Sequence, residues 1–128
     1  MLALDRLRGL RVIAGASALN AARWEGFGEV VVMRFAPDDV FALGARNVDI
    51  DDEHAIVEEE TGFVGAWLSP DELDRVVSRI EWPLQTRRPV LAQGLIGGVP
   101  AKLWLAQDGS SLLLTAAPFA AELRARLR

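Results

Sequence analysis

Residues 69–80, SPDELDRVVSRI, combine a helix start signal with apolar positions at helical spacing. Ser69 is a favourable N-cap, Pro70 suits the first helical position, and Glu72 completes a capping box with Ser69. The apolar positions that follow are Leu73, Val76, Val77 and Ile80. Because they recur at i, i+3, i+4 and i+7, they predict an amphipathic helix that packs on a core.

Period-two and β-branched patterns predict two hairpins before this helix. A β-branched run, EVVVMRFA (29–36), is followed by the turn residues PDD and by a second short run, VFALGA (40–45). Further along, two runs are joined across TG: AIVEEE (55–60) and FVGAWL (63–68). We therefore expect one hairpin over residues 29–45 and another over residues 55–68, with the polar stretch NVDIDDEH connecting them.

The last part of the chain predicts a meander and a terminal helix. Three apolar runs, VLAQGLI, AKLWLAQ and SSLLLTAA, are separated by the turn signals Gly97-Gly98 and Asp108-Gly109. The final stretch, PFAAELRARLR, has a helical start at Pro118 and arginines near its end, where they favour the helix dipole.

The first 28 residues carry the least regular pattern. Leu4, Leu7 and Leu10 lie on a loose helical spacing that Gly9 and Gly15 weaken. Residues 17–24, SALNAARW, suit a helix, either continuous with the preceding stretch or separate from it. We expect a helical or irregular segment over residues 1–28 and an α+β body over residues 29–128.

The pattern as a whole predicts a single α+β domain over residues 1–128. It would hold a mostly antiparallel sheet of about 6–7 strands and two or three helices. The composition is 51% hydrophobic and 25% charged, which is typical of a globular domain with one core. No internal repeat or linker interrupts the chain.

Charge and cysteine content narrow the functional classes. A net charge of −4 with scattered arginines does not favour nucleic-acid binding, and the lack of cysteine excludes disulfides and thiol chemistry. Asp5, Arg6 and Arg8 interrupt the apolar N-terminus, so we expect no signal peptide. No apolar run approaches the ~20 residues of a membrane helix. We expect a cytoplasmic protein that binds neither nucleic acid nor membrane.

None of the chemically reactive residues forms a recognisable catalytic or metal-binding motif. His54 lies among the carboxylates of residues 49–60, which would suit a metal site or, as we expect, a solvated acidic loop. The glycines at 94, 97 and 98 match neither a dinucleotide fingerprint nor a P-loop, and the serines lack a nucleophile elbow. We predict no catalytic residue, no metal and no cofactor bound by this chain.

The tryptophans suggest one candidate interface. Trp67 and Trp104 lie within apolar strands, so we expect both in the core. Trp82 precedes Pro83 after the predicted helix, with Arg87 and Arg88 nearby. Because Trp and Arg dominate binding hot spots, Trp82, Arg87 and Arg88 are a candidate partner interface. The alternative is that Trp82 caps the edge of the core beside a solvated arginine pair.

From residue 33 onward the chain resembles a known family. The shared order is a hairpin (RFAPDDVFAL), a strand pair (HAIVEEETGFVGAWL), a helix start (LSPDELDRVV), the segment EWPLQT, a second hairpin (AQGLIGGVPAKLWL) and a strand with a terminal helix (SSLLLTAAPFAAELRARL). This order is similar to that of the gamma subunit of heterotetrameric sarcosine oxidase, a family related to the folate-binding domain of the glycine-cleavage T-protein. Two differences are that residues before 29 do not match and that EWPL replaces a Cys-Pro-Leu segment.

The resemblance implies a T-protein-like fold and a role in one-carbon metabolism. It implies a non-catalytic accessory or assembly subunit of a sarcosine-oxidase-like oxidoreductase, with flavoprotein subunits as partners. Flavin, NAD and folate would then be held by those partner subunits. Two alternatives stay open: a stand-alone domain that binds a folate-like or other planar ligand, and a homodimeric domain of unrelated role.

Overall fold

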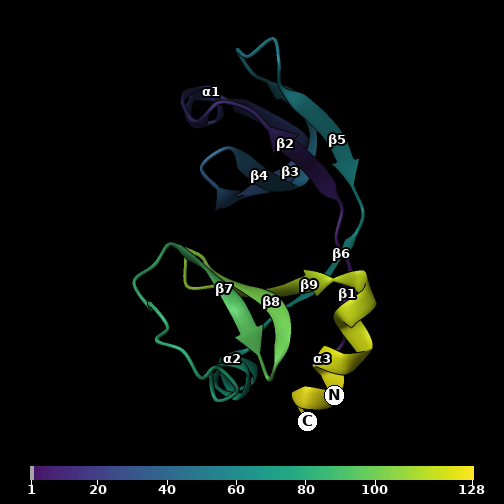
Figure 1. Ribbon diagram of the computed structural model, residues 1–128, viewed down its shortest axis with the longest axis vertical. Coiled ribbons are helices and arrows are strands. Elements are labelled where there is room, and N and C mark those ends of the chain that lie inside the picture. Colours follow the sequence, from purple (N-terminus) through teal and green to yellow (C-terminus); the bar gives the residue numbers. More distant parts are fainter. Residues whose placement is uncertain (1) are drawn as a thin grey trace. The chain divides into compact units, whose positions relative to one another are not determined.

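The computed structural model describes residues 2–128 and shows an α+β fold with antiparallel strand pairing. Its strands form two sheets, one of five strands and one of four (Figure 1). Each sheet belongs to one of two compact units. We call residues 7–61 the inserted unit and residues 2–6 with 62–128 the terminal unit.

The inserted unit holds the four-stranded sheet in the order β3-β4-β2-β5. Its elements are β2 (Gly9–Ile13), α1 (Ala16–Ala21), β3 (Arg23–Ala36), β4 (Asp39–Asp49) and β5 (Ile56–Glu60). Val12 and Val40 face each other across β2 and β4 and are buried, together with Leu19 of α1. The helix therefore covers an apolar face of this sheet.

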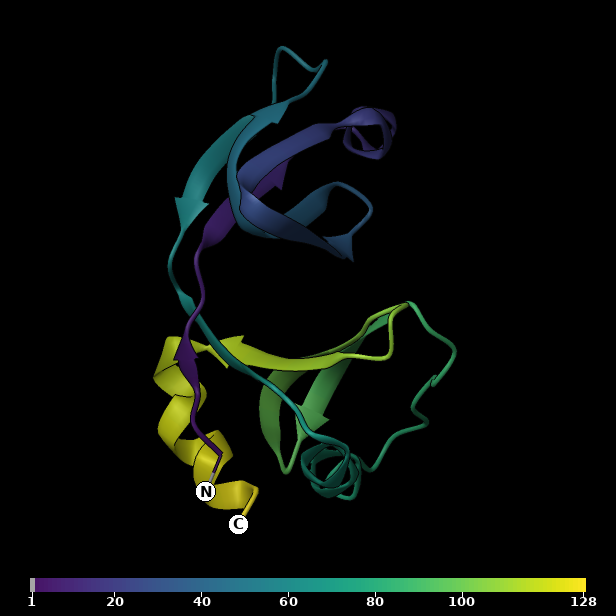
Figure 2. The ribbon, with the colours of Figure 1, turned by 180° about the vertical axis from the view of Figure 1, so that it is seen from behind.

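The terminal unit holds the five-stranded sheet in the order β1-β6-β9-β8-β7. Its strands are β1 (Asp5–Arg6), β6 (Phe63–Trp67), β7 (Val90–Ile96), β8 (Val99–Leu105) and β9 (Ser111–Ala116). Its helices are α2 (Pro70–Val77), the 3-10 turn η1 (Ala117–Phe119) and α3 (Ala120–Arg126), which Figure 2 shows from behind. Val76 of α2 and Leu123 of α3 are buried in the same cluster as Leu103 and Leu113 of the sheet.

Helix α2 begins as its sequence predicts. Ser69 Oγ accepts a hydrogen bond from the Glu72 backbone N–H (3.2 Å), and Glu72 Oε1 accepts one from the Ser69 backbone N–H (2.8 Å). The second bond is the main reason that the pKa of Glu72 lies below its ordinary value. The predicted capping box is therefore confirmed.

The predicted hairpin over residues 29–45 and the predicted meander are confirmed. Strand β3 pairs with β4, with Met33 opposite Phe41, and β7, β8 and β9 pair in sequence. Positive φ angles at Gly97 (58°), Gly98 (82°) and Gly109 (96°) mark the two turns.

No helix within residues 2–128 is long and apolar enough to cross a membrane.

The helical expectation for the start of the chain is wrong between Gly9 and Ile13, which form β2. Residue 1 lies outside the described residues. Strand β2 is central in its sheet, because it pairs with β4 on one side and β5 on the other. These long-range ladders satisfy the backbone of β2 on both edges, and tertiary pairing thus overrides a weak helical spacing. A short helix does form at Ala16–Ala21.

The predicted second hairpin is also wrong, although both of its strands exist. Strand β5 pairs with β2, whereas β6 pairs with β1 and β9. The residues read as a turn, Thr61 and Gly62, are where the chain passes from the inserted unit to the terminal unit. The expected single sheet of about 6–7 strands is consequently divided into two sheets.

Candidate binding surfaces

Trp82 lies partly buried at the edge of the terminal unit. Its Nε1–H donates to the Leu95 carbonyl (2.8 Å), and its ring packs so close to Gly94 that a Cβ at that residue would lie 2.8 Å from the indole. Trp82 also packs against the core cluster of that unit. The side chain therefore has an intramolecular role, as the core-edge interpretation expects, and its contact with a partner stays a prediction.

Arg87 and Arg88 have different surroundings. The Arg88 guanidinium donates to the Ala106 carbonyl (3.0 Å), the Ser110 carbonyl (2.6 Å) and Ser111 Oγ (2.8 Å). It thereby ties the turn between β8 and β9 to the segment before β7. Arg87 is exposed. Of the predicted interface residues, Arg87 is thus the one that is exposed.

The core prediction for Trp67 is wrong, because its side chain is 49% exposed. Trp67 is the last residue of β6, where the strand leaves the sheet toward α2. Trp104 is partly buried, and its Nε1 is buried without a hydrogen-bond acceptor among residues 2–128. The apolar runs thus predicted both strands correctly, but they did not indicate which of the two tryptophan rings would be buried.

In the acidic stretch around His54, Asp52 makes a structural contact within the inserted unit. Asp52 accepts backbone N–H bonds from Gly15 (2.8 Å) and His54 (2.9 Å), and both bonds lower the pKa of the Asp52 carboxyl. This carboxylate joins the connection between β4 and β5 to the start of α1. His54 is exposed, with Nε2 3.4 Å from Glu53 Oε1. Within residues 2–128, no three His, Cys, Asp or Glu side chains are grouped to hold a metal ion.

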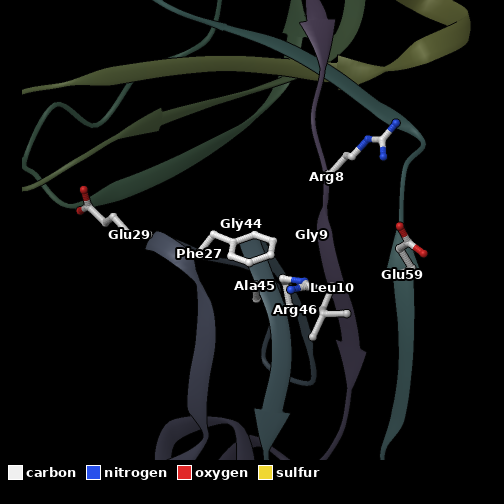
Figure 3. Close-up of a pocket in the computed structure, with 10 residues that line it drawn as sticks. Arg8, Gly9, Leu10, Phe27, Glu29, Gly44, Ala45, Arg46 and Glu59 are labelled. Carbon is white, nitrogen blue, oxygen red and sulfur yellow. The ribbon is translucent and has the colours of Figure 1, made fainter.

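A cavity in the inserted unit has a volume of about 630 Å³ and was not anticipated from the sequence. It is lined by Arg8, Gly9, Leu10, Phe27, Gly28, Glu29, Gly44, Ala45, Arg46 and Glu59. Figure 3 shows the Phe27 ring beside the Arg46 guanidinium. Arg8 and Glu59 lie on one side of this pair, and Glu29 lies on the other. Its volume lies in the range of small-molecule sites.

An irregular stretch of β3 and β4 builds one side of this cavity. Glu25 is opposite Asn47 but Gly26 is opposite Ala45, which leaves Arg46 as an extra residue in β4. The next pair is Val31 with Leu43, so residues 27–30 loop out opposite Gly44. Both Phe27 and Arg46 are therefore presented by bulged backbone.

Two glycines make this double bulge possible. A Cβ at Gly26 would lie 2.2 Å from the Gly44 carbonyl oxygen, so the two backbones approach more closely than any side chain permits. Gly44 itself has a φ of 86°, in the left-handed region, and its N–H donates to the Arg8 carbonyl (2.9 Å). The close approach and the positive φ both require glycine at these positions.

Phe27 is the most exposed large apolar side chain among residues 2–128, at 89%. The Arg46 Cζ lies 4.1 Å from the centroid of its ring, a cation–π contact. Neither Arg46 nor Arg8 forms an ion pair with a carboxylate in the described part of the chain. The available sequence signal was EGFGEV, in which an aromatic residue stands between two glycines just before a β-branched run.

A second, smaller cavity of about 290 Å³ lies in the terminal unit. Its lining includes Leu95, Lys102, Phe63 and Phe119, and both Leu95 and Phe119 are exposed. It offers an apolar surface with one ammonium group and no acid–base or nucleophilic pair.

Comparisons with known proteins address the fold. No protein-family model and no curated protein sequence matches this chain. Among solved structures, the chain is similar to one chain of the heterotetrameric sarcosine oxidase from Corynebacterium sp. U-96 in complex with pyrrole 2-carboxylate. The TM-score is 0.68 at 15% identity, over 98% of this chain and 78% of that chain.

The fold is thus similar to that of a sarcosine oxidase subunit, and the α+β prediction is confirmed. The similarity includes the first 28 residues, where the sequence motifs did not match, because it covers nearly the whole chain. Conserved architecture at such low identity does not carry over individual functional residues.

Proposed function

We propose that this chain is a non-catalytic accessory subunit of a flavoenzyme complex, comparable to the gamma subunit of sarcosine oxidase. One observation carries the proposal: the fold is similar, over 98% of the chain, to a polypeptide that belongs to a heterotetrameric oxidase. The motif order from residue 33 onward supports the gamma subunit as the counterpart.

Exposed apolar side chains support a role in association. In the inserted unit, Ile13 and Ile56 are directly opposite each other on β2 and β5, and both are exposed. Val32, Val57 and Phe27 of the same unit are exposed as well. Subunits of permanent complexes carry more apolar surface than monomers, since their partners cover it.

In this proposal the reaction takes place elsewhere in the complex. Flavin, NAD and folate would be held by the partner subunits, because cofactors carry the redox chemistry and this chain would supply surface and shape. Trp82, Arg87 and Arg88 remain the proposed contact of the terminal unit with a partner.

Gentle affinity purification of the tagged chain from its native cell tests the proposal. We expect a stoichiometric flavoprotein partner, identified by mass spectrometry, and a flavin absorbance spectrum in the eluate. A colourless eluate that contains only this chain, as monomer or homo-oligomer, would falsify the accessory-subunit function.

The cavity beside Phe27 favours a second candidate function, a stand-alone domain that binds a planar ligand. An exposed aromatic ring and two guanidinium groups are suited to a ring that bears a carboxylate. Calorimetric titration of the isolated chain with folates discriminates the two functions. Saturable binding by a chain that purifies without a protein partner would favour this alternative.

A further inference from the structure

The exposure of Phe27 is not explained by the packing of the chain itself. Burying a Phe side chain gives a favourable free energy relative to leaving it in water. Phe27 forgoes nearly all of this, since 89% of it is exposed. A single exposed apolar residue is ordinary on a protein surface. Phe27 differs because it lies on a bulge that two glycines make possible.

The bulge holds its aromatic ring between regular strand pairs. Before it, Trp24 is paired with Val48; after it, Val32 is paired with Ala42, so β3 is anchored to β4 on both sides. The Arg46 guanidinium stacks on the ring at 4.1 Å and comes from the adjacent bulge of β4. A ring held in place before association loses less conformational entropy when a partner binds it.

Arg46 adds a specific chemical requirement. A guanidinium stacked on an aromatic ring keeps its in-plane N–H donors free, and these match the two oxygens of a carboxylate. Arg46 has no carboxylate partner within residues 2–128, so its donors are available to another molecule. The complement of this pair is an apolar recess with an Asp or Glu at its edge.

The surroundings favour a protein over a small anion. Small-molecule sites enclose most of their ligand, whereas Phe27 protrudes into solvent. Glu29 and Glu59 also line the cavity, and their negative charges oppose a polyanion. A rim with two guanidinium groups and two carboxylates instead matches a protein surface that presents charges of both signs.

We propose that Phe27 and Arg46 form the anchor of the partner interface: Phe27 inserts into an apolar recess of the flavoprotein subunit, and Arg46 pairs with an Asp or Glu carboxylate beside that recess. This inference rests on the accessory-subunit function and assigns its main contact to the inserted unit.

Variants of the chain test the anchor in the assembled complex. Phe27→Ala should weaken the affinity for the captured flavoprotein at least tenfold, as expected for a hot spot. Arg46→Lys should also weaken it severalfold, because an ammonium neither stacks flat nor binds a carboxylate bidentately. Phe119→Ala, which removes another exposed phenylalanine from the terminal unit, is the matched control and should change affinity less than twofold.

Two further measurements make the result specific. The melting temperature of isolated Phe27→Ala should equal that of the unaltered chain, since Phe27 is outside the core. Phe27 replaced by photoreactive benzoylphenylalanine should cross-link to a flavoprotein peptide that contains apolar residues and an Asp or Glu.

The outcomes separate the two proposals. If the flavoprotein is captured but Phe27→Ala and Arg46→Lys bind it normally, the anchor is wrong and the accessory function stands. The anchor is also wrong if Phe119→Ala weakens the affinity as much as Phe27→Ala does, or if residue 27 cross-links only to a second copy of this chain. It is likewise wrong if the variants lose a small ligand but still associate with the flavoprotein. If the unaltered chain captures no flavoprotein, the accessory function fails and the anchor with it.

Discussion

At the scale of single residues, Arg87 and Arg88 show how adjacent identical side chains acquire different roles. The sequence presents them as one basic pair. In the structure Arg88 donates three hydrogen bonds to the β8–β9 turn, whereas Arg87 is exposed. A cation held by two carbonyls and a buried serine contributes to stability, while an exposed one is free to contact a partner.

We expect Arg88→Ala to lower the free energy of unfolding by about 2 kcal/mol, because it leaves the Ser111 hydroxyl and two carbonyls without their charged donor. Urea denaturation of the isolated chain measures this change. Arg87→Ala is the matched control and should change stability by less than about 0.5 kcal/mol. Equal losses for the two variants would contradict the distinct roles. A weaker flavoprotein complex with Arg87→Ala would support its predicted interface role.

At the scale of elements, α2 shows what helical periodicity specifies and what it leaves open. Its N-terminal cap forms as the motif predicts. The apolar stripe was expected to bury Val76 and Val77 alike, but Val76 is 1% exposed and Val77 is 37% exposed. Consecutive helical residues are about 100° apart, so only one of them can point directly at the sheet. The expectation that Val77 faces the core is wrong.

We expect Val76→Ala to destabilise the chain by about 1.5–3 kcal/mol, since it removes two buried methyl groups and leaves a cavity. Val77→Ala makes the same chemical change at the exposed edge of the stripe and should cost less than about 1 kcal/mol. Thermal or urea unfolding of both variants tests the difference. A larger loss for Val77→Ala would mean that α2 packs with the other residue inward.

At the scale of the whole molecule, the path of the chain links the two compact units. The terminal unit contains residues 2–6 and 62–128, so the chain leaves it after Arg6 and returns at Gly62. Strand β1 therefore pairs with β6 although residues 7–61 separate the two strands in the sequence. Leu2 and Leu4 pack against the core cluster of the terminal unit, so this N-terminal stretch is part of that unit. The sequence-based prediction of a single domain stays a prediction.

We expect the full chain to unfold in one calorimetric transition. If residues 7–61 unfolded alone, β1 would have to stay paired with β6 across a long flexible loop, and closing that loop costs entropy. Unfolding of the inserted unit should therefore weaken the terminal unit. Differential scanning calorimetry tests this by comparing the calorimetric and van't Hoff enthalpies. Two separate transitions would overturn the single-domain prediction.

Local chemistry allowed much of the fold to be predicted from the sequence. The capping box at Ser69, the turns at Gly97 and Gly109, and the β-branched runs act through the nearest neighbours, so their patterns predicted α2, the meander and the first hairpin correctly. The same information predicted the α+β fold class. It also predicted the resemblance to a sarcosine oxidase subunit at the level of fold.

Strand partners, burial and the candidate anchor were decided only by tertiary structure. Whether β5 pairs with β6 or with β2 depends on residues far away along the chain, and so does the exposure of Trp67. Phe27 and Arg46 lie on adjacent strands of one hairpin, but the bulges that present them beside Gly44 were not indicated by the strand patterns. Sequence patterns report local preferences, whereas register and coverage are set by contacts between distant segments.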